Sequence, residues 1–306
     1  MLGVHMGMTQ DEDMKPPLFD YYDPSTEAET LALLAAYGPD AKILAGGQSL
    51  MPLLNMRLVE PTLLIDVNRV ESLSYIRRTP TALHIGALTR QRQVERSALV
   101  ARHCPLLCDA LQHVGYTPIR QRGTIGGSLA HADPAAELPA VMTTLEAQFV
   151  LRSQRGSRVL TPAEFFVTYL TTALEPDELL CDVHIPLPPP RTGWGFVEVA
   201  RVTGAFAIVG AAVLLTLDTA GRCPRARVAF TGVGPVPQRA YQTEAVLQGQ
   251  LLDTQCLQSA AQLADHDLGC DSDMHASAAY RRNLARVLAQ RALHLAWQRA
   301  QEGPTV

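Results

Sequence analysis

Two adjacent glycines, Gly126 and Gly127, lie within a run of small residues that extends from Gly123 to Pro139. Glycine is entropically costly in ordered structure and gives a core no side chain to pack. A glycine pair therefore indicates either a positive φ or a bound molecule close to the backbone. The segment 45–50, Ala-Gly-Gly-Gln-Ser-Leu, shows the same pattern about eighty residues earlier. Together the two segments predict one ligand held between two loops.

The first glycine segment lies between a predicted strand and a predicted helix. Residues 42–44 have the character of a short buried strand, and Ser49 can cap a helix that runs to about Leu58. Pro52 falls in the first turn of that helix, where a missing N–H costs nothing. A strand, a glycine turn and a helix start direct free N–H groups and a positive dipole end toward an anion. The pattern predicts a cofactor that carries phosphate.

The second glycine segment ends in two prolines and two acids. Pro134 and Pro139 cannot both lie inside one regular helix, so we expect an irregular segment around Asp133 and a helix that begins near Glu137 or Leu138. The two carboxylates then lie beside the glycines as hydrogen-bond acceptors. They suit ribose hydroxyls, and they suit helix capping equally well.

Composition limits the class of protein. A length of 306 residues suggests about two domains, and 47% hydrophobic and 18% charged residues exclude a disordered chain. The net charge of −4 offers no basic surface for nucleic acid. No apolar run reaches the roughly 18–20 residues of a membrane helix. The polar N-terminus, 1–17, lacks a signal pattern, so we expect a cytoplasmic protein with a disordered start and no membrane span.

Several chemical motifs are missing from the sequence. The six cysteines include no Cys-x-x-Cys pair, so the chain supplies no iron–sulfur cluster of its own. Cys104 and Cys108, near His103 and His113, fit one face of a helix better than a metal site. Gly-x-Gly-x-x-Gly, the P-loop, His-Glu-x-x-His and Gly-x-Ser-x-Gly are all absent. The two glycine segments remain as the strongest functional signal, and they favour a nucleotide site.

Hydrophobic patterns predict an α+β chain with a break near its middle. Prolines between 186 and 190 form a stiff connection that we take as a domain boundary. Before it, we predict strands at 62–67 and 179–185, hairpins over 73–86 and 148–160, helices near Thr89 and at 105–114, and a capping box at 161–164. After it, we predict an antiparallel meander of three strands at 196–202, 208–218 and 226–233, and helices at 255–264 and 278–301.

The long C-terminal helix has a predicted buried side and a predicted solvated side. We expect its buried stripe at Tyr280, Leu284, Val287, Leu288 and Leu295. We expect its solvated face to carry Arg281, Arg282, Arg286 and Arg299.

Three stretches of the sequence resemble a known family. Segments 43–58 and 115–139 and the tail 274–282 are similar to the FAD-binding medium subunit of molybdenum hydroxylases, the group that includes carbon monoxide dehydrogenase and xanthine dehydrogenase. The resemblance covers about 19–300. It implies a vanillyl-alcohol-oxidase (PCMH)-type FAD-binding domain of two α/β subdomains at 18–187. It also implies a flavoprotein C-terminal domain at 191–302, with a three-stranded antiparallel sheet and a helical bundle.

The resemblance also implies the site and the partners. FAD would carry the redox chemistry, no residue would be catalytic and the chain would bind no metal. Molybdopterin would lie on a large partner subunit and two 2Fe–2S clusters on a small one, within a dimer of heterotrimers. Electrons would pass from the clusters through FAD to NAD or another acceptor. The FAD-binding positions would be Leu44, Ala45, Gly46, Gly47, Gln48, Ser49, Leu50, Val114, Thr124, Ile125, Gly126, Gly127, Ser128, Glu137 and Leu180.

The sequence departs from this family at two positions near the expected flavin. Ala200 replaces a lysine that many relatives carry, and Ala205 interrupts a common Gly-Asp-aromatic step. Loss of the lysine would remove a charge that stabilises reduced flavin. Phe206 is expected either to stack near the flavin or to pack into the core. A stand-alone FAD-dependent oxidase or dehydrogenase is therefore an alternative, and a flavin-free scaffold is a third possibility that the intact glycine segments disfavour.

Overall fold

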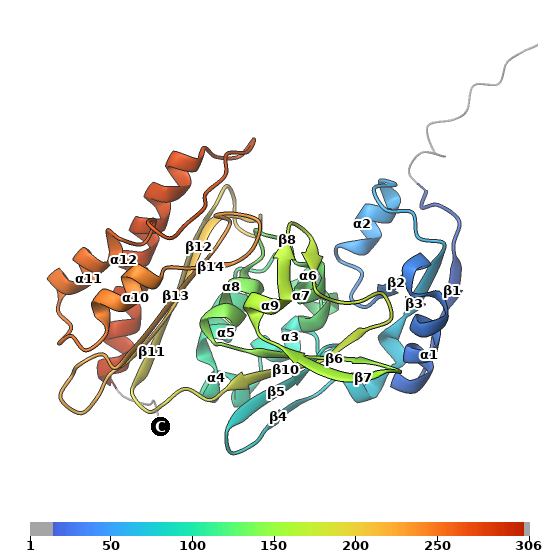
Figure 1. The fold of residues 1–306 in the computed structure, drawn as a ribbon, viewed down its shortest axis with the longest axis horizontal. Coiled ribbons are helices and arrows are strands. Elements are labelled where there is room, and N and C mark those ends of the chain that lie inside the picture. The colour runs from blue at the N-terminus through green and yellow to red at the C-terminus, as the bar shows by residue number, and fades with distance from the viewer. Residues whose placement is uncertain (1–14, 303–306) are drawn as a thin grey trace, which may run out of the picture.

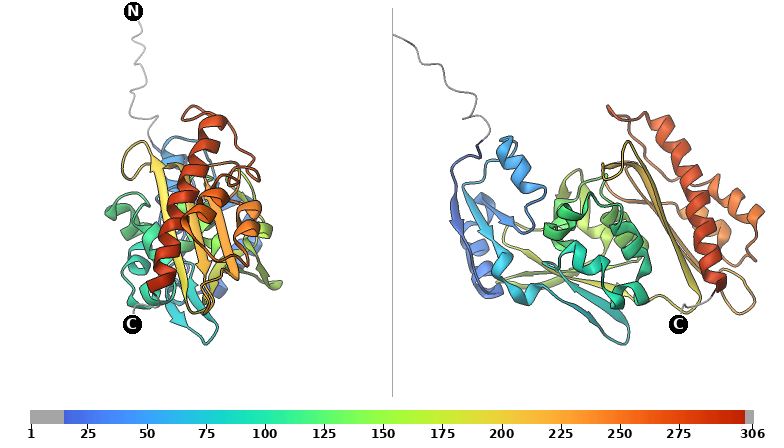
Figure 2. Two further views of the ribbon diagram at one scale, coloured as in Figure 1. Left: turned by 90° about the vertical axis from the view of Figure 1, so that its left-hand side faces the viewer. Right: turned by 180° about the vertical axis from the view of Figure 1, so that it is seen from behind.

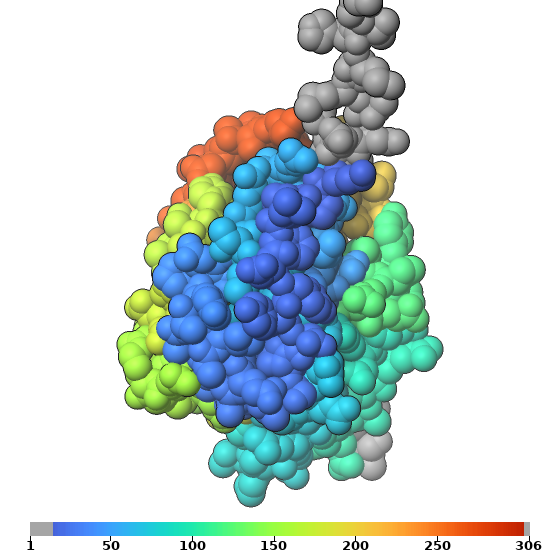
Figure 3. Space-filling model, turned by 90° about the vertical axis from the view of Figure 1, so that its right-hand side faces the viewer, coloured from blue at the N-terminus to red at the C-terminus, as the bar shows by residue number. Residues whose placement is uncertain are grey.

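The computed structural model describes residues 15–302, which form three parts in a row (Figure 1). A three-stranded sheet lies at one end, a five-stranded sheet with helices lies in the middle, and a four-stranded sheet with helices lies at the other end (Figures 1 and 2). Figure 3 looks onto the end that the first part forms. The predicted disordered N-terminus, 1–17, lies outside the described residues up to residue 14. None of the helices within 15–302 combines the length and the apolarity needed to cross a membrane.

The first part is a parallel sheet with strand order β1–β3–β2. Its elements are β1 (Asp20–Tyr22), α1 (Glu27–Tyr37), η1 (Gly38–Asp40), β2 (Ala41–Leu44), α2 (Leu50–Asn55), β3 (Leu63–Asp66), η2 (Val67–Arg69) and η3 (Glu71–Leu73). Two predicted strands, 42–44 and 62–67, are confirmed as β2 and β3. Only Ala41 of β2 is fully buried, so that strand is less buried than we expected. We did not predict β1 or α1.

The middle part is an antiparallel sheet with strand order β4–β5–β10–β6–β7. Both predicted hairpins and the predicted strand over 179–185 are confirmed. The strands are β4 (Ile76–Arg78), β5 (Ala82–Gly86), β6 (Gln148–Ser153), β7 (Gly156–Leu160) and β10 (Leu179–Pro186), and a separate hairpin contains β8 (Phe166–Thr168) and β9 (Thr171–Thr172).

Short helices cover one side of this sheet (Figure 1). The helices predicted near Thr89, from Pro105 and near Glu137 are confirmed as α3, α5 and α8, and α9 begins at the predicted capping box, where the Glu164 carboxylate accepts hydrogen bonds from Thr161. We did not predict α4 or α6. The helices are α3 (Gln91–Glu95), α4 (Ala98–His103), α5 (Pro105–Leu111), α6 (Thr117–Arg122), α7 (Ile125–His131), α8 (Glu137–Thr144) and α9 (Pro162–Phe165).

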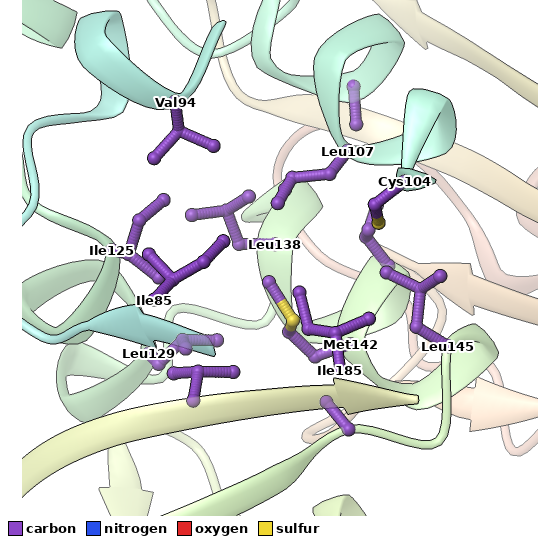
Figure 4. Packing of buried hydrophobic residues seen from close by; sticks show 14 of the residues in the cluster. Ile85, Val94, Cys104, Leu107, Ile125, Leu129, Leu138, Met142, Leu145 and Ile185 are labelled. Atoms are coloured by element: carbon purple, nitrogen blue, oxygen red, sulfur yellow. The ribbon is translucent and has the colours of Figure 1, made fainter. Parts of the chain in front are cut away.

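The main core lies between the five-stranded sheet and these helices (Figure 4). Ile85 and Ile185 come from the sheet, and Ile125, Leu138 and Met142 come from α7 and α8. All five side chains are essentially inaccessible to solvent. Cys104 and Cys108 belong to the same core, and burial raises the pKa of the Cys104 thiol to about 12. The second glycine segment is therefore anchored on a packed surface.

The third part is the predicted antiparallel meander, extended by one short strand to the order β11–β12–β13–β14. Our three-stranded prediction omitted β14, which contains only two residues. Its elements are β11 (Thr192–Ala200), β12 (Ala207–Thr216), β13 (Arg225–Thr231), β14 (Gln238–Arg239), α10 (Tyr241–Leu247), α11 (Thr254–Ala261) and α12 (Ala278–Glu302). The predicted break at prolines 186–190 begins at Pro186, the last residue of β10, and ends before β11. The division into 18–187 and 191–302 stays a prediction.

Helix α12 has the predicted length, but its predicted buried stripe is confirmed only in part. Leu284 and Leu288 are buried together with a row of alanines, Leu295 is half-buried, and Tyr280 and Val287 are exposed. The reason is close packing on β11: a Cβ on Gly193 would lie 1.9 Å from the Ala296 carbonyl oxygen. Backbones this close leave room only for small side chains. The solvated-face prediction was also wrong for Arg281, which is buried.

Candidate cofactor site

The first glycine segment forms the turn between β2 and α2. Gly47 has φ = 73°, a left-handed conformation that glycine adopts without steric cost. Ser49 occupies the N-cap position, but its side chain makes no capping hydrogen bond, which corrects our prediction. Helix α2 ends at Asn55 rather than Leu58, because Arg57 adopts a left-handed φ of 53°.

The backbone donors of this turn are unused. Among residues 15–302, the N–H groups of 46–49 find no hydrogen-bond acceptor. Gly46 is buried, and residues 47–49 are partly exposed. Leu44, Ala45 and Leu50, at the two ends of the turn, are partly exposed as well. Unpaired N–H groups at a partly open turn form a binding site for an anion such as a diphosphate. The residues present therefore fit the phosphate end of FAD.

The second glycine segment is a helix start, although we predicted a loop. Thr124 is the N-cap of α7, and its hydroxyl accepts a hydrogen bond from the Gly127 N–H at 3.0 Å. The N–H groups of Ile125, Gly126 and Ser128 also donate within the chain, to carbonyls of Thr89, Ala87 and Thr124 in turn. Neither glycine has a positive φ. The backbone donors on this side are therefore already satisfied.

The glycines of α7 are required by packing. A Cβ on Gly126 would lie 2.5 Å from the Ala87 Cβ and 2.8 Å from its carbonyl oxygen, and a Cβ on Gly127 would lie 2.7 Å from the Thr124 Oγ1. Ala87 directly follows β5, so α7 packs against the end of that strand. The small residues of α7 leave no large side chain beside the first glycine turn.

The fold brings the two glycine segments into contact. A Cβ on Gly46 would lie 2.5 Å from the Arg122 carbonyl oxygen and 2.8 Å from the Gly123 Cα. Side-chain hydrogen bonds also join the two segments. Arg90 donates to the Arg122 carbonyl and, at 2.6 Å, to Asn68 Oδ1. Asn68 Nδ2 then donates to the Ala45 carbonyl at 2.8 Å. Sequence reasoning missed Arg90 and Asn68, because no local motif marks a bond between distant turns.

The two acids of the second segment differ in environment. Asp133 makes a local turn in which its Oδ1 accepts from the Ala135 N–H at 2.8 Å. Glu137 is the first residue of α8 and is 6% exposed. Burial, reinforced by the nearby Glu198 charge, raises the pKa of Glu137 to about 8. Glu137 is therefore mostly protonated at neutral pH and can donate a hydrogen bond.

A histidine and a second acid accompany Glu137. His113 Nδ1 lies 3.3 Å from Glu198 Oε1, and this hydrogen bond raises the pKa of His113 while burial opposes the shift. Glu198 Oε2 is buried and has no partner within 15–302. The three groups lie close enough to interact electrostatically beside the start of α8.

The two apolar positions predicted to line the cofactor lie in different settings. Val114 follows α5 and is half-buried against the main core. Leu180, in β10, is only 5% exposed and belongs to that core. Helix α7 contacts β10, so Leu180 lies on the same side of the sheet as the glycines.

A cleft of about 550 Å³ lies where the middle and third parts meet. Pro134 lines it from the second glycine segment, and its carbonyl accepts hydrogen bonds from Thr231 and Gly232 of the third part. The cleft therefore begins at the far end of the segment that contacts the first glycine turn. Its lining also includes Tyr169, Ala205, Phe206, Asp271, Asp273 and Arg281.

Charged and aromatic side chains shape this cleft. Phe206 is 69% exposed, which excludes the core-packing interpretation of this residue. The buried Arg281 donates to Asp273 Oδ2 at 2.6 Å and to the carbonyls of Ile208 and Gly232. Sequence reasoning missed this role, although Arg281 lies in the tail that carried the family resemblance. Ala200, which we expected to lie near the flavin, is the last residue of β11.

Two family models match most of the chain. The FAD binding domain in molybdopterin dehydrogenase matches residues 17–188, and the CO dehydrogenase flavoprotein C-terminal domain matches residues 194–296.

Individual proteins are similar over nearly the whole length. The chain is 42% identical over 287 residues to the 6-hydroxypseudooxynicotine dehydrogenase complex subunit alpha of Paenarthrobacter nicotinovorans, covering 94% of this chain and 97% of the relative. It is 35% identical over 286 residues to the carbon monoxide dehydrogenase medium chain of Hydrogenophaga pseudoflava, covering 94% and 99%. The crystal structure of quinoline 2-oxidoreductase from Pseudomonas putida 86 matches with a TM-score of 0.89 and 39% identity, covering 94% and 99%.

Proposed function

Because this chain belongs to the family of FAD-binding medium subunits of molybdenum hydroxylases, we propose that it binds FAD between its two glycine segments and relays electrons within a larger complex. The unpartnered N–H groups of 46–49 carry this proposal, because a diphosphate supplies the acceptors that they lack. When bound, FAD can take electrons from iron–sulfur clusters and pass them to NAD or another acceptor.

The residues of this chain would bind and orient the cofactor. The first turn supplies backbone donors, and the start of α7 supplies a surface of small side chains beside them. The Arg90 and Asn68 hydrogen bonds hold the two segments in register. Glu137 holds its proton at neutral pH and can donate it in a hydrogen bond. The cleft with the exposed Phe206 offers a stacking surface for a planar ring.

The proposed division of labour places substrate chemistry on other chains. The names of two relatives refer to 6-hydroxypseudooxynicotine and to carbon monoxide, which have little chemistry in common, yet both proteins align along nearly all of this chain. The six cysteines here are separate free thiols. We therefore propose a large molybdopterin subunit, a small 2Fe–2S subunit and a dimer of heterotrimers.

Ser49 allows a sharp test of the phosphate site. Its side chain caps nothing, so Ser49→Ala removes no capping bond and should leave FAD affinity within about threefold of wild type. Ser49→Asp places a carboxylate among the unpartnered N–H groups and should weaken FAD binding at least about tenfold, because like charges repel. Titration of the full-length protein with FAD, followed by flavin fluorescence, measures both. A wild-type protein that stays colourless with FAD, or two variants that bind equally well, would overturn the proposal.

Purification of the native protein tests the partners. We expect molybdopterin, iron–sulfur clusters and two further subunits to accompany the chain. A native protein that carries FAD, turns over alone and brings no partner would support the stand-alone oxidoreductase instead, a reading favoured by Ala200 and Ala205.

A further inference from the structure

Two histidines and an aspartate gather on the sheet face that points away from the helices. His84 of β5 and His184 of β10 are directly opposite each other in the antiparallel ladder, and Asp182 is paired with Gly86. The flanking residues Leu83 and Ile85 point into the main core. Because side chains alternate along a strand, His84 lies on the opposite face. The trio is therefore separated from the glycine segments by the thickness of the sheet.

The ligand atoms of the trio already converge. Asp182 Oδ2 lies 2.8 Å from His184 Nε2 and 3.5 Å from His84 Nδ1, and one donor atom from each residue lies within 4.8 Å of the others. Tetrahedral sites with metal–ligand bonds of about 2.0–2.2 Å separate their ligands by about 3.3–3.6 Å. Closing the trio on an ion thus needs only small side-chain adjustments.

Two buried polar atoms of the trio have no hydrogen-bond partner among the described residues. They are His84 Nδ1 and Asp182 Oδ1. The Asp182 side chain is only 4% exposed, and the His84 side chain 15%. Buried polar atoms are normally satisfied, so each unpaired atom calls for an explanation. Nearby Thr79 Oγ1 lies 3.4 Å from His84 Nε2, which leaves Nδ1 as the nitrogen that faces Asp182.

From these contacts we propose that His84, Asp182 and His184 form a binding site for one divalent transition-metal ion of the Zn²⁺ class. Two imidazoles and one carboxylate are the donor set that such ions prefer, whereas Mg²⁺ prefers oxygen ligands alone. His184 is 28% exposed, so the ion can enter from solvent and keep water in its remaining position. A bound ion would tie β5 to β10.

The arginine nearest to the site along the sheet is occupied elsewhere. Arg77 of β4 is the cross-strand neighbour of His84, but its guanidinium stacks on the Tyr75 ring at 4.4 Å. No lysine or arginine among residues 15–302 forms an ion pair with Asp182, so its carboxylate faces only the two histidines in this way.

Metal titration of the chelator-treated, full-length protein tests this site. We expect one Zn²⁺ or Co²⁺ ion per chain by calorimetry, with a Co²⁺ absorption spectrum typical of low coordination number, and no comparable Mg²⁺ binding. His184→Ala should weaken binding more than about 100-fold, because even partners of metal ligands contribute 10–100-fold. His294→Ala, on the exposed side of α12, is the matched control and should bind like wild type.

Asp182→Asn keeps the shape of the side chain and guards against a variant that fails to fold. It should lose Zn²⁺ affinity while its unfolding midpoint without metal stays close to that of wild type. No stoichiometric Zn²⁺ binding by the wild type, or binding that survives both His184→Ala and Asp182→Asn, would overturn the proposal. FAD titration of the same variants should match the wild type, since the trio lies on the other face of the sheet.

Discussion

The two glycine segments share a sequence pattern but differ in what their glycines do. In the first, Gly47 is left-handed and the N–H groups of 46–49 have no acceptor within the described residues. In the second, Gly126 and Gly127 are helical, their N–H groups are satisfied, and a side chain at Gly126 would collide with Ala87. One glycine pair thus leaves backbone N–H groups free for a ligand, and the other permits close packing. Substitutions can therefore separate ligand affinity from stability.

Glu137, the buried acid of the second segment, should make the stability of the protein depend strongly on pH. The unfolded chain loses this proton near pH 4.5, whereas the folded protein keeps it up to about pH 8. The folded state thus binds more protons between these values, and the free energy of unfolding falls as the pH rises, by at most about 1.4 kcal/mol per pH unit. The side chain of Glu137→Gln stays neutral, so this variant should lack the slope. Between pH 5 and pH 8 its free energy of unfolding should therefore rise relative to wild type by up to several kcal/mol.

Urea unfolding at a series of pH values measures this difference in slope. Glu60→Gln, at an exposed position, is the matched control and should run parallel to wild type. Parallel curves for Glu137→Gln and wild type would show that Glu137 ionises normally in the folded protein.

The next effect tests the packing role of Gly126. Gly126→Ala forces a Cβ against the Ala87 backbone, so we expect the FAD-free protein to lose about 2–3 kcal/mol of unfolding free energy. Gly269→Ala is the control, because a Cβ there has no neighbour closer than 3.8 Å. It should stay within about 0.5 kcal/mol of wild type. An equally stable Gly126→Ala would contradict the packing explanation.

Arg90 tests the link between the segments. Arg90→Ala removes the charged hydrogen bonds to Arg122 and Asn68, at an expected cost of about 2 kcal/mol. FAD affinity should fall as well, because Asn68 and the first turn lose their support. The exposed Arg96→Ala controls for loss of charge. If both variants bind FAD like wild type, the link does not position the turn.

Gly47 gives the smallest change in stability and the clearest separation. Gly47→Ala places a side chain at positive φ, which costs about 1 kcal/mol. Gly249→Ala has the same strain, with φ = 79° and nothing within 4 Å of the new Cβ. Both variants should lose similar stability in urea, but only Gly47→Ala should lower FAD affinity, by about tenfold. Equal affinities would place the cofactor elsewhere.

Local chemistry in the sequence was sufficient for most elements and for the family. Both long hairpins, the capping box at Thr161 and the C-terminal meander follow from alternation, turn residues and caps, which act within a few residues. The same kind of signal could have found α1, since Thr26 and Glu29 form a capping box that we did not use. The two glycine segments were likewise visible, together with their expected ligand class.

Tertiary structure decided the role of each of these residues. Gly126 is needed because Ala87, some forty positions earlier, approaches it. Arg281 is buried because its guanidinium reaches the carbonyls of Ile208 and Gly232 on the neighbouring sheet. His84 and His184 meet only through the register of β5 and β10. Such contacts depend on distances between residues far apart in the chain, and local pattern carries no information about those distances. The sequence alone predicted a shared task for the two glycine segments, and only the folded chain decided that one offers free backbone donors and the other permits packing.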